Sequence, residues 1–220
     1  NLQGAIVISD AMHAQRDTSS QIVAEGGDYI WTIKGNQPRT HWAIEKLFVH
    51  EVCNLRQGAP LSKHCHMATQ VNKGEGRVEK RTILVSTELN DYLDWPHVAQ
   101  VFRIERTIWH EKHKGRTRQV VYGLTSLTPQ QASPERLLTL VRQYWGIESG
   151  LHYRRDVTLH EDATRLTVGH AGQIMAILNN LVIGLCLQHG FQNLAKARRM
   201  FNAKPSMALD LILTAQTPFL

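Results

Sequence analysis

Two acidic residues, Asp10 and Glu148, occupy positions in the chain where a carboxylate could do chemistry. Asp10 closely follows residues 5–8, a short β-branched run typical of a strand that is buried on both faces. Ligands of α/β sheets gather beyond the carboxyl ends of their strands, so this carboxylate is well placed to hold a metal ion. The alternative is that Asp10 only caps the following turn, as aspartate often does.

Glu148 lies in a segment with helical periodicity that begins near Ser133. Seven residues make nearly two helical turns, so Glu148 and Arg155 are predicted to project from one face, with His152 between them. An acid, an imidazole and a guanidinium would then line up on one helix. The alternative is an ordinary salt bridge on the protein surface.

Other chemistries have weaker support in the sequence. The group His50, Cys53, His64, Cys65 and His66 lacks the paired Cys-x-x-Cys spacing of zinc sites, so we interpret it as surface histidines with two free thiols. The sequence contains no glycine-rich phosphate loop and no nucleophile in a recognisable elbow. Three cysteines at irregular spacing favour a reducing, cytoplasmic compartment.

The elements that must position these residues follow a simple order. A strand at 5–8, a short helix introduced by the capping pattern at 18–21, and a strand at 29–34 predict one parallel, right-handed βαβ unit. A helix follows from Pro38. Antiparallel strands are then predicted at 67–71, 77–87, 98–110 and 117–126, and helices from Ser133 through Asp156 and over 170–188. The fold class is therefore α/β.

Composition and charge narrow the possible functions. The chain has 220 residues, 42% hydrophobic and 20% charged, which excludes disordered, collagenous and disulfide-scaffold proteins. The net charge is +6, and its excess is concentrated in residues 103–118 and 163–220, so phosphate backbones are the natural partner. The longest apolar stretch, residues 174–187, is shorter than the ~20 residues of a bilayer crossing, which predicts a core helix and no membrane span.

Six short segments, taken in order, resemble a known family. They are Ile-Ser-Asp-Ala-Met-His-Ala-Gln at 8–15, Gly-Gly-Asp-Tyr at 26–29, Lys-Gly-Asn-Gln at 34–37, Tyr-Trp-Gly-Ile-Glu at 144–148, Leu-His-Tyr-Arg-Arg-Asp-Val at 151–157 and Glu-Asp at 161–162. Together they resemble the transposases of ISAs-type bacterial insertion sequences, whose relatives include the H-repeat-associated proteins. The resemblance runs through at least residues 4–200.

The resemblance implies a ribonuclease-H-like core with an Asp-Asp-Glu (DDE) metal triad, interrupted by an antiparallel β-rich insertion and completed by C-terminal helices. Residues 1–55 would be the N-terminal part of the catalytic core, 56–130 the insertion, and 131–220 the C-terminal helical part. The implied activity is metal-dependent cleavage and transfer of DNA strands during transposition.

The resemblance also assigns roles to individual residues. Asp10 matches the second Asp of the triad and Glu148 matches the Glu, and both would bind metal, with two Mg²⁺ or Mn²⁺ ions in a complete enzyme. Arg155 matches a basic residue that contacts DNA near the scissile phosphate. Further candidates for DNA contact are Lys34, His152 and His13. Val141 and Tyr144 stand where some relatives have tyrosine and arginine, so those two roles do not transfer.

Residues 1–9 carry no acidic side chain that could be the first Asp of the triad. We therefore expect the chain to be the C-terminal part of a transposase, inactive on its own, that would act on DNA as a homodimer. Three other readings stay open: a non-catalytic DNA-binding remnant that uses residues 103–118 and 196–204, a ribonuclease-H-like nuclease without strand transfer, and a relic without function.

Overall fold

A computed structural model describes residues 1–74, 76–110, 115–147, 150, 152–166 and 168–214. The chain divides into two compact units, Asn1–Tyr144 and Trp145–Leu220. The division falls inside helix α3 (Pro134–Ile147), and each unit is described by itself. The domain limits at residues 55 and 130 stay a prediction.

The first unit is built on one six-stranded sheet with the strand order β1-β2-β6-β5-β4-β3. The strands are β1 (Ile6–Ser9), β2 (Asp28–Ile33), β3 (Cys65–Gly74), β4 (Arg77–Ser86), β5 (Gln100–His110) and β6 (Arg116–Thr125). β1 and β2 pair in parallel, and all other neighbours are antiparallel. Both the βαβ unit and the four antiparallel strands predicted from sequence are confirmed. β6 pairs directly with β2, so the βαβ unit and the four antiparallel strands belong to one sheet.

Helix α1 (Arg16–Ala24) connects β1 to β2, but it does not begin at the predicted capping pattern. Its N-cap is Gln15, and Ser19 lies inside the helix, fully buried. The Ser19 hydroxyl donates to the Gln15 carbonyl oxygen at 2.8 Å and accepts from the Trp31 indole N–H at 2.8 Å. The predicted cap is wrong because the hydroxyl satisfies a buried indole instead of the helix terminus.

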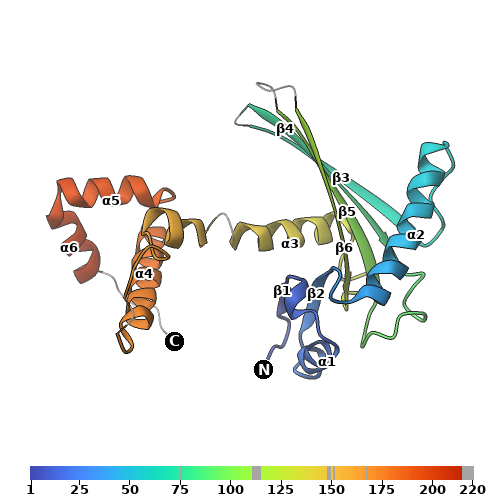
Figure 1. Ribbon diagram of the computed structural model, residues 1–220, viewed down its shortest axis with the longest axis horizontal. Helices are drawn as coiled ribbons and strands as arrows, with labels where there is room; N and C mark the ends of the chain where they lie inside the picture. The colour runs from blue at the N-terminus through green and yellow to red at the C-terminus, as the bar shows by residue number, and fades with distance from the viewer. Residues whose placement is uncertain (75, 111–114, 148–149, 151, 167, 215–220) are drawn as a thin grey trace. The chain divides into compact units, whose positions relative to one another are not determined.

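Helices cover both faces of the sheet. α1 and α2 (Pro38–Arg56) lie on one face and α3 on the other (Figure 1). On the α2 face, Ile44 and Phe48 pack with Trp31 and Leu124, all of them at most 1% exposed. Burying each such side chain stabilises the fold by roughly 1.5–3 kcal/mol. This core fixes the position of the β1–α1–β2 unit that carries Asp10.

Gly123 in β6 is needed where β2, β5 and β6 meet. A Cβ at this position would lie 2.2 Å from Cζ of Phe102 and 2.4 Å from the carbonyl oxygen of Trp31. Both distances are shorter than any side chain tolerates, and one partner is backbone. Because Gly123 has no side chain, β6 can pair with β2 on one side and with β5 on the other.

The second unit is helical and has a small core. Its elements are η3 (Arg154–Thr158), α4 (Ala171–Gln188), α5 (Leu194–Ala203) and α6 (Pro205–Thr214). The buried cluster consists of Ile183, Cys186, Leu194 and Ala197. The predicted helix over 170–188 is confirmed, but the prediction that it is a core helix is wrong, since Ile183 and Cys186 are its only buried residues among those described.

The helical patterning predicted from Ser133 through Asp156 is confirmed over Pro134–Ile147, and the type of helix is corrected beyond it. α3 ends at Ile147, residues 148, 149 and 151 lie outside the described residues, and η3 is wound as a π-helix. A π-helix has more residues per turn than an α-helix, so the α-helical spacing argument does not carry through to Arg155.

α4 has 18 residues and a mean hydropathy of 1.4, which meets the length and composition of a minimal membrane span, and 11% of it is buried. Asn179, in the middle of this helix, donates from its side-chain amide to Oε2 of Glu161 at 2.9 Å. This hydrogen bond ties the middle of α4 to the loop that precedes the helix.

Candidate active site

Asp10 lies directly beyond the last residue of β1 and caps a short 3₁₀ helix, η1 (Ala11–His13). Its Oδ1 accepts a hydrogen bond from the Met12 backbone N–H at 3.1 Å, so Asp10 does cap the following turn, and its role as a metal ligand stays a prediction. β1 and β2 are parallel and end at the same edge of the sheet, which places Asp10, His13 and Lys34 at that edge. Asp10 is half-buried, whereas His13 and Lys34 are exposed.

The loop after β2 holds the turn that carries Asp10. The Asn36 side-chain amide donates to the carbonyl oxygen of Ala11, and the Gln37 amide donates to that of Ala14 at 3.1 Å. These two bonds explain structurally the Lys-Gly-Asn-Gln motif at 34–37. The sequence pattern predicted no structural role for Asn36 and Gln37. Two amide side chains just beyond a parallel strand were the feature that could have indicated such a role.

The other predicted metal ligand, Glu148, lies outside the described residues, so its proximity to Asp10 stays a prediction. Within the described part of the chain, no three His, Cys, Asp or Glu side chains gather closely enough to hold a metal ion. That finding includes the described His50 to His66 group.

The cysteines of that group have different environments. Cys53 and Cys65 are both free thiols, as expected, but only Cys53 is exposed. Cys65 is buried in the core, and burial raises its pKa to about 12. Cys65 is therefore an unreactive core residue.

Arg155, the predicted DNA contact, is held by a carboxylate of its own unit. Its Nε donates to Oε2 of Glu161 at 2.9 Å, and its Nη2 donates to Oε1. The hydrogen bonds from Arg155, followed by the one from Asn179, lower the pKa of Glu161 to about 2. Glu161 thus orients Arg155, a role that sequence reasoning missed. His152 is exposed in the same unit.

Comparison with known proteins gives a consistent set of relatives. The chain is 29% identical over 191 residues to "H repeat-associated putative transposase YhhI" of Escherichia coli K12, an alignment that covers 84% of this chain and 48% of the relative. "Putative protein YbfL" of the same strain aligns with the same identity and coverage. "Putative transposase YncI" of Escherichia coli O157:H7 is 27% identical over 84% of this chain and 46% of its own length.

The chain is a relative of the H repeat-associated putative transposases. The resemblance stated from sequence is thereby confirmed at the level of this family. The chain spans about half the length of the curated relatives that it matches. No protein-family model and no solved structure matches it.

In this transposase relative, the predicted basic stretch 103–118 forms part of an organised surface on strands β3 to β6, whose distal ends extend beyond the helices (Figure 1). The described residues of these four strands carry eight lysines and arginines but only two carboxylates, Glu79 and Glu105. The two carboxylates point to opposite faces of the sheet, because Arg81 lies across from Arg106 while Thr82 lies across from Glu105.

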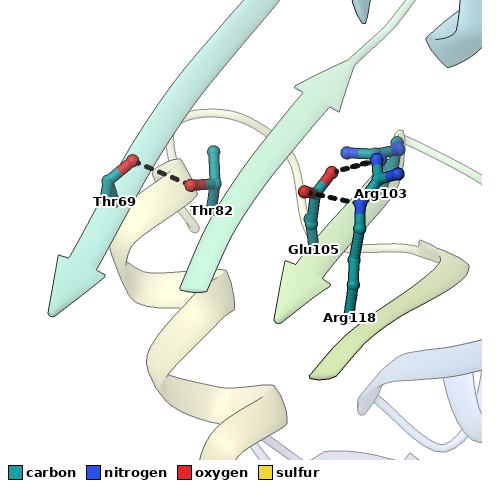
Figure 2. Close-up of polar contacts among 5 residues, drawn as sticks. All are labelled: Thr69, Thr82, Arg103, Glu105 and Arg118. Atoms are coloured by element: carbon teal, nitrogen blue, oxygen red, sulfur yellow. Dashed lines mark hydrogen bonds and ion pairs between the residues drawn. The ribbon is translucent and has the colours of Figure 1, made fainter. Parts of the chain in front are cut away.

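On one face, Glu105 lies between Arg103 and Arg118 (Figure 2). Arg118 donates to both oxygens of Glu105 at 2.8 Å, and Arg103 donates to Oε2 at 2.6 Å. Hydrogen bonds from Arg118, followed by those from Arg103, lower the pKa of Glu105 to about 2. The neighbouring hydroxyls of Thr69 and Thr82 bond across β3 and β4 at 3.2 Å. One positive charge of this cluster stays uncompensated.

On the opposite face, Glu79 bonds Arg81 at 2.7 Å and also Arg106. Burial raises the pKa of Glu79, but the hydrogen bond from Arg106 and the surrounding arginine charges outweigh burial, so the net shift is downward. Nε and Nη1 of the buried Arg81 have no hydrogen-bond partner among the described residues. The carboxylates therefore organise the arginines without neutralising them.

Proposed function

We propose that this chain supplies Asp10 and Glu148 to a DDE-type site that cleaves and transfers DNA strands in transposition. The observation that carries the proposal is the position of Asp10, at the carboxyl end of a parallel strand and on a turn fixed by Asn36. Relatives with transposase names, aligned over 84% of the chain, support the same reading. Among the candidate residues of this chain, Asp10 and Glu148 are the first that we propose as catalytic residues.

The chemistry of the donor set fits a hard divalent cation, because carboxylate oxygens are the ligands that Mg²⁺ and Mn²⁺ prefer. Asp10 and Glu148 would hold it, and when bound it supplies Lewis-acid stabilisation for displacement at phosphorus. Asp10 uses Oδ1 to cap η1, which fixes the direction of its carboxylate at the sheet edge. Lys34, at the same edge, is positioned to attract phosphate oxygens, and Arg155 is oriented by Glu161 for the same task.

The proposal includes a ribonuclease-H-like arrangement of the β1–α1–β2 unit, with β3 to β6 as its insertion. It also includes DNA as the partner, two divalent ions in the complete site, two copies acting on two DNA ends, and a cytoplasmic location. Because the family site uses three carboxylates and the resemblance assigns two of them to this chain, the chain alone is expected to bind metal without cutting DNA.

The test is Mn²⁺ binding by the 220-residue chain, measured by electron paramagnetic resonance. Asp10→Asn and Glu148→Gln should each weaken binding at least tenfold. Glu25→Gln is the matched control, since Glu25 precedes the amino end of β2, at the opposite edge of the sheet, where it pairs with the N-terminal amine at 3.0 Å. Equal Mn²⁺ affinity in Asp10→Asn and in the unaltered chain would overturn the proposal.

A second candidate, DNA binding without catalysis, is favoured by the excess of cations on β3 to β6. Lys80→Gln and Arg116→Gln, made together, should weaken binding of a duplex oligonucleotide and reduce the slope of log affinity against log salt by about 2. DNA binding that Asp10→Asn leaves unchanged, combined with no Mn²⁺ binding by the unaltered chain, would favour this candidate over the first.

A further inference from the structure

The second unit contains a cavity of about 670 Å³ between η3 and α5. Its polar lining includes Arg154, His160, Asn193, Arg198, Arg199 and Asn202. All of these residues belong to the second unit, so the cavity exists within a single compact body. Its volume is in the range of pockets that hold small organic ligands, and it is far larger than a single inorganic anion requires.

The charge of this cavity is positive. Three guanidinium groups line it, and no carboxylate does so among the described residues. This contrasts with the adjacent Arg155, which forms an ion pair with Glu161. A group of arginines without a carboxylate selects an anionic ligand, because each planar guanidinium offers paired N–H donors to phosphate oxygens.

Backbone carbonyls, which carry no net charge, hold two of these arginines in place. Arg198 Nη1 donates to the carbonyl oxygen of Thr158 at 3.0 Å, and Arg154 Nη2 donates to that of Gln192 at 3.3 Å. Each bond uses one of the five N–H donors of a guanidinium and leaves the positive charge uncompensated. His160, which also lines the cavity, has a left-handed backbone with φ of 57°, a conformation that concentrates at functional sites.

We propose that this cavity binds phosphate groups of a nucleic-acid strand through Arg154, Arg198 and Arg199. The affinity for phosphate follows from the cavity itself, whereas the choice of a nucleic acid as its source rests on the proposed function. The site is distinct from the Asp10 edge and requires no metal. A strand of phosphodiesters would place successive phosphates along one face of α5.

The test is binding of a fluorescein-labelled 20-nucleotide single strand to the 220-residue chain in the presence of EDTA, which removes any contribution from a metal site. Arg199→Gln should weaken binding about tenfold and lower the salt slope by about 1, because one phosphate contact is lost. Arg165→Gln removes the same charge from an exposed position of the same unit that does not line the cavity, and should change affinity less than twofold.

Arg198→Gln serves as a second variant, with circular dichroism to check the fold because it also loses the bond to Thr158. Equal affinities in Arg199→Gln, Arg165→Gln and the unaltered chain would overturn the proposal. Pyrophosphate binding that falls in Arg199→Gln while strand binding does not would also overturn it, in favour of a small phosphate ligand. Failure of the Mn²⁺ test leaves this readout unaffected, so the two proposals fail separately.

Discussion

The two units of this chain differ in how completely they bury their apolar side chains. The sheet unit has a core on the α2 face in which large side chains such as Trp31 and Phe48 are at most 1% exposed. The helical unit buries four residues in its cluster, while Ile177 on α4 and Leu213 on α6 are 66% and 73% exposed. Burial of apolar side chains therefore contributes more stability to the sheet unit. The helical unit leaves apolar side chains exposed, where they are available for contact.

The arginines of the strands and those of the cavity also have different partners. On the strands, Glu79 and Glu105 organise arginines into ion-pair clusters, whereas the cavity of the second unit holds Arg198 with a backbone carbonyl. An arginine bound to a carboxylate shares its N–H donors with that carboxylate, which offsets part of the positive charge. An arginine bound to a carbonyl keeps its full charge for a ligand. The arginines of the cavity are thus the more available for binding an anion.

Truncation of one buried leucine in each core tests the difference in burial most directly and should have the largest effect. Leu124→Ala, in β6, removes a fully buried side chain at the centre of the sheet unit and should lower the free energy of unfolding by about 4 kcal/mol. Leu194→Ala, in the small cluster of the second unit, should cost about 2 kcal/mol because the site can relax. Hydrogen exchange followed by mass spectrometry reads the units separately, and equal losses of protection would contradict the difference.

Addition of a methyl group to one glycine in each unit tests the same difference in packing. Gly123→Ala should destabilise the sheet unit by about 3 kcal/mol, because its Cβ meets Phe102 and the backbone of Trp31. Gly184→Ala, on the exposed side of α4, meets nothing within 4 Å and should stabilise its helix by up to about 1 kcal/mol. Thermal denaturation of both variants checks the signs; a stabilising Gly123→Ala would refute the packing described for β6.

The smallest expected effect concerns pH. The pKa of Glu105 is depressed from 4.5 to about 2, so its contribution to stability is complete above pH 4.5 and is lost as the pH falls through 2. Glu105→Gln should cost about 1 kcal/mol at pH 7 and make the decline of stability between pH 4.5 and pH 2 shallower. Urea denaturation across this range measures both.

The matched change Glu161→Gln should act on the second unit instead. The pKa of Glu161 is likewise about 2, so the sign and the pH window are the same. Loss of its bonds to Arg155 and Asn179 should increase hydrogen exchange in η3 and α4 but leave β5 and β6 unchanged. Increased exchange in the strands of Glu161→Gln would show that the two ion-pair clusters are coupled.

Local sequence determined much of this protein. The β-branched run before Asp10, the aromatic run at 29–34 and the turns between the later strands were enough to predict a parallel pair and four antiparallel strands, because side-chain period and turn chemistry act over a few residues. Charge content alone indicated a phosphate partner. The motif at 34–37 marked the loop that fixes the Asp10 turn, although its role in holding that turn was not predicted.

Only the tertiary structure decided which partner each polar side chain has. Ser19 serves a buried indole rather than a helix cap, Cys65 lies in the core, and Arg155 is held by Glu161 and, through it, by Asn179 on another helix. The arginines divide into those that bond carboxylates and those that bond backbone carbonyls for the same reason. Such pairings join residues that are distant in sequence, and their energies depend on burial and on orientation, which no local pattern specifies.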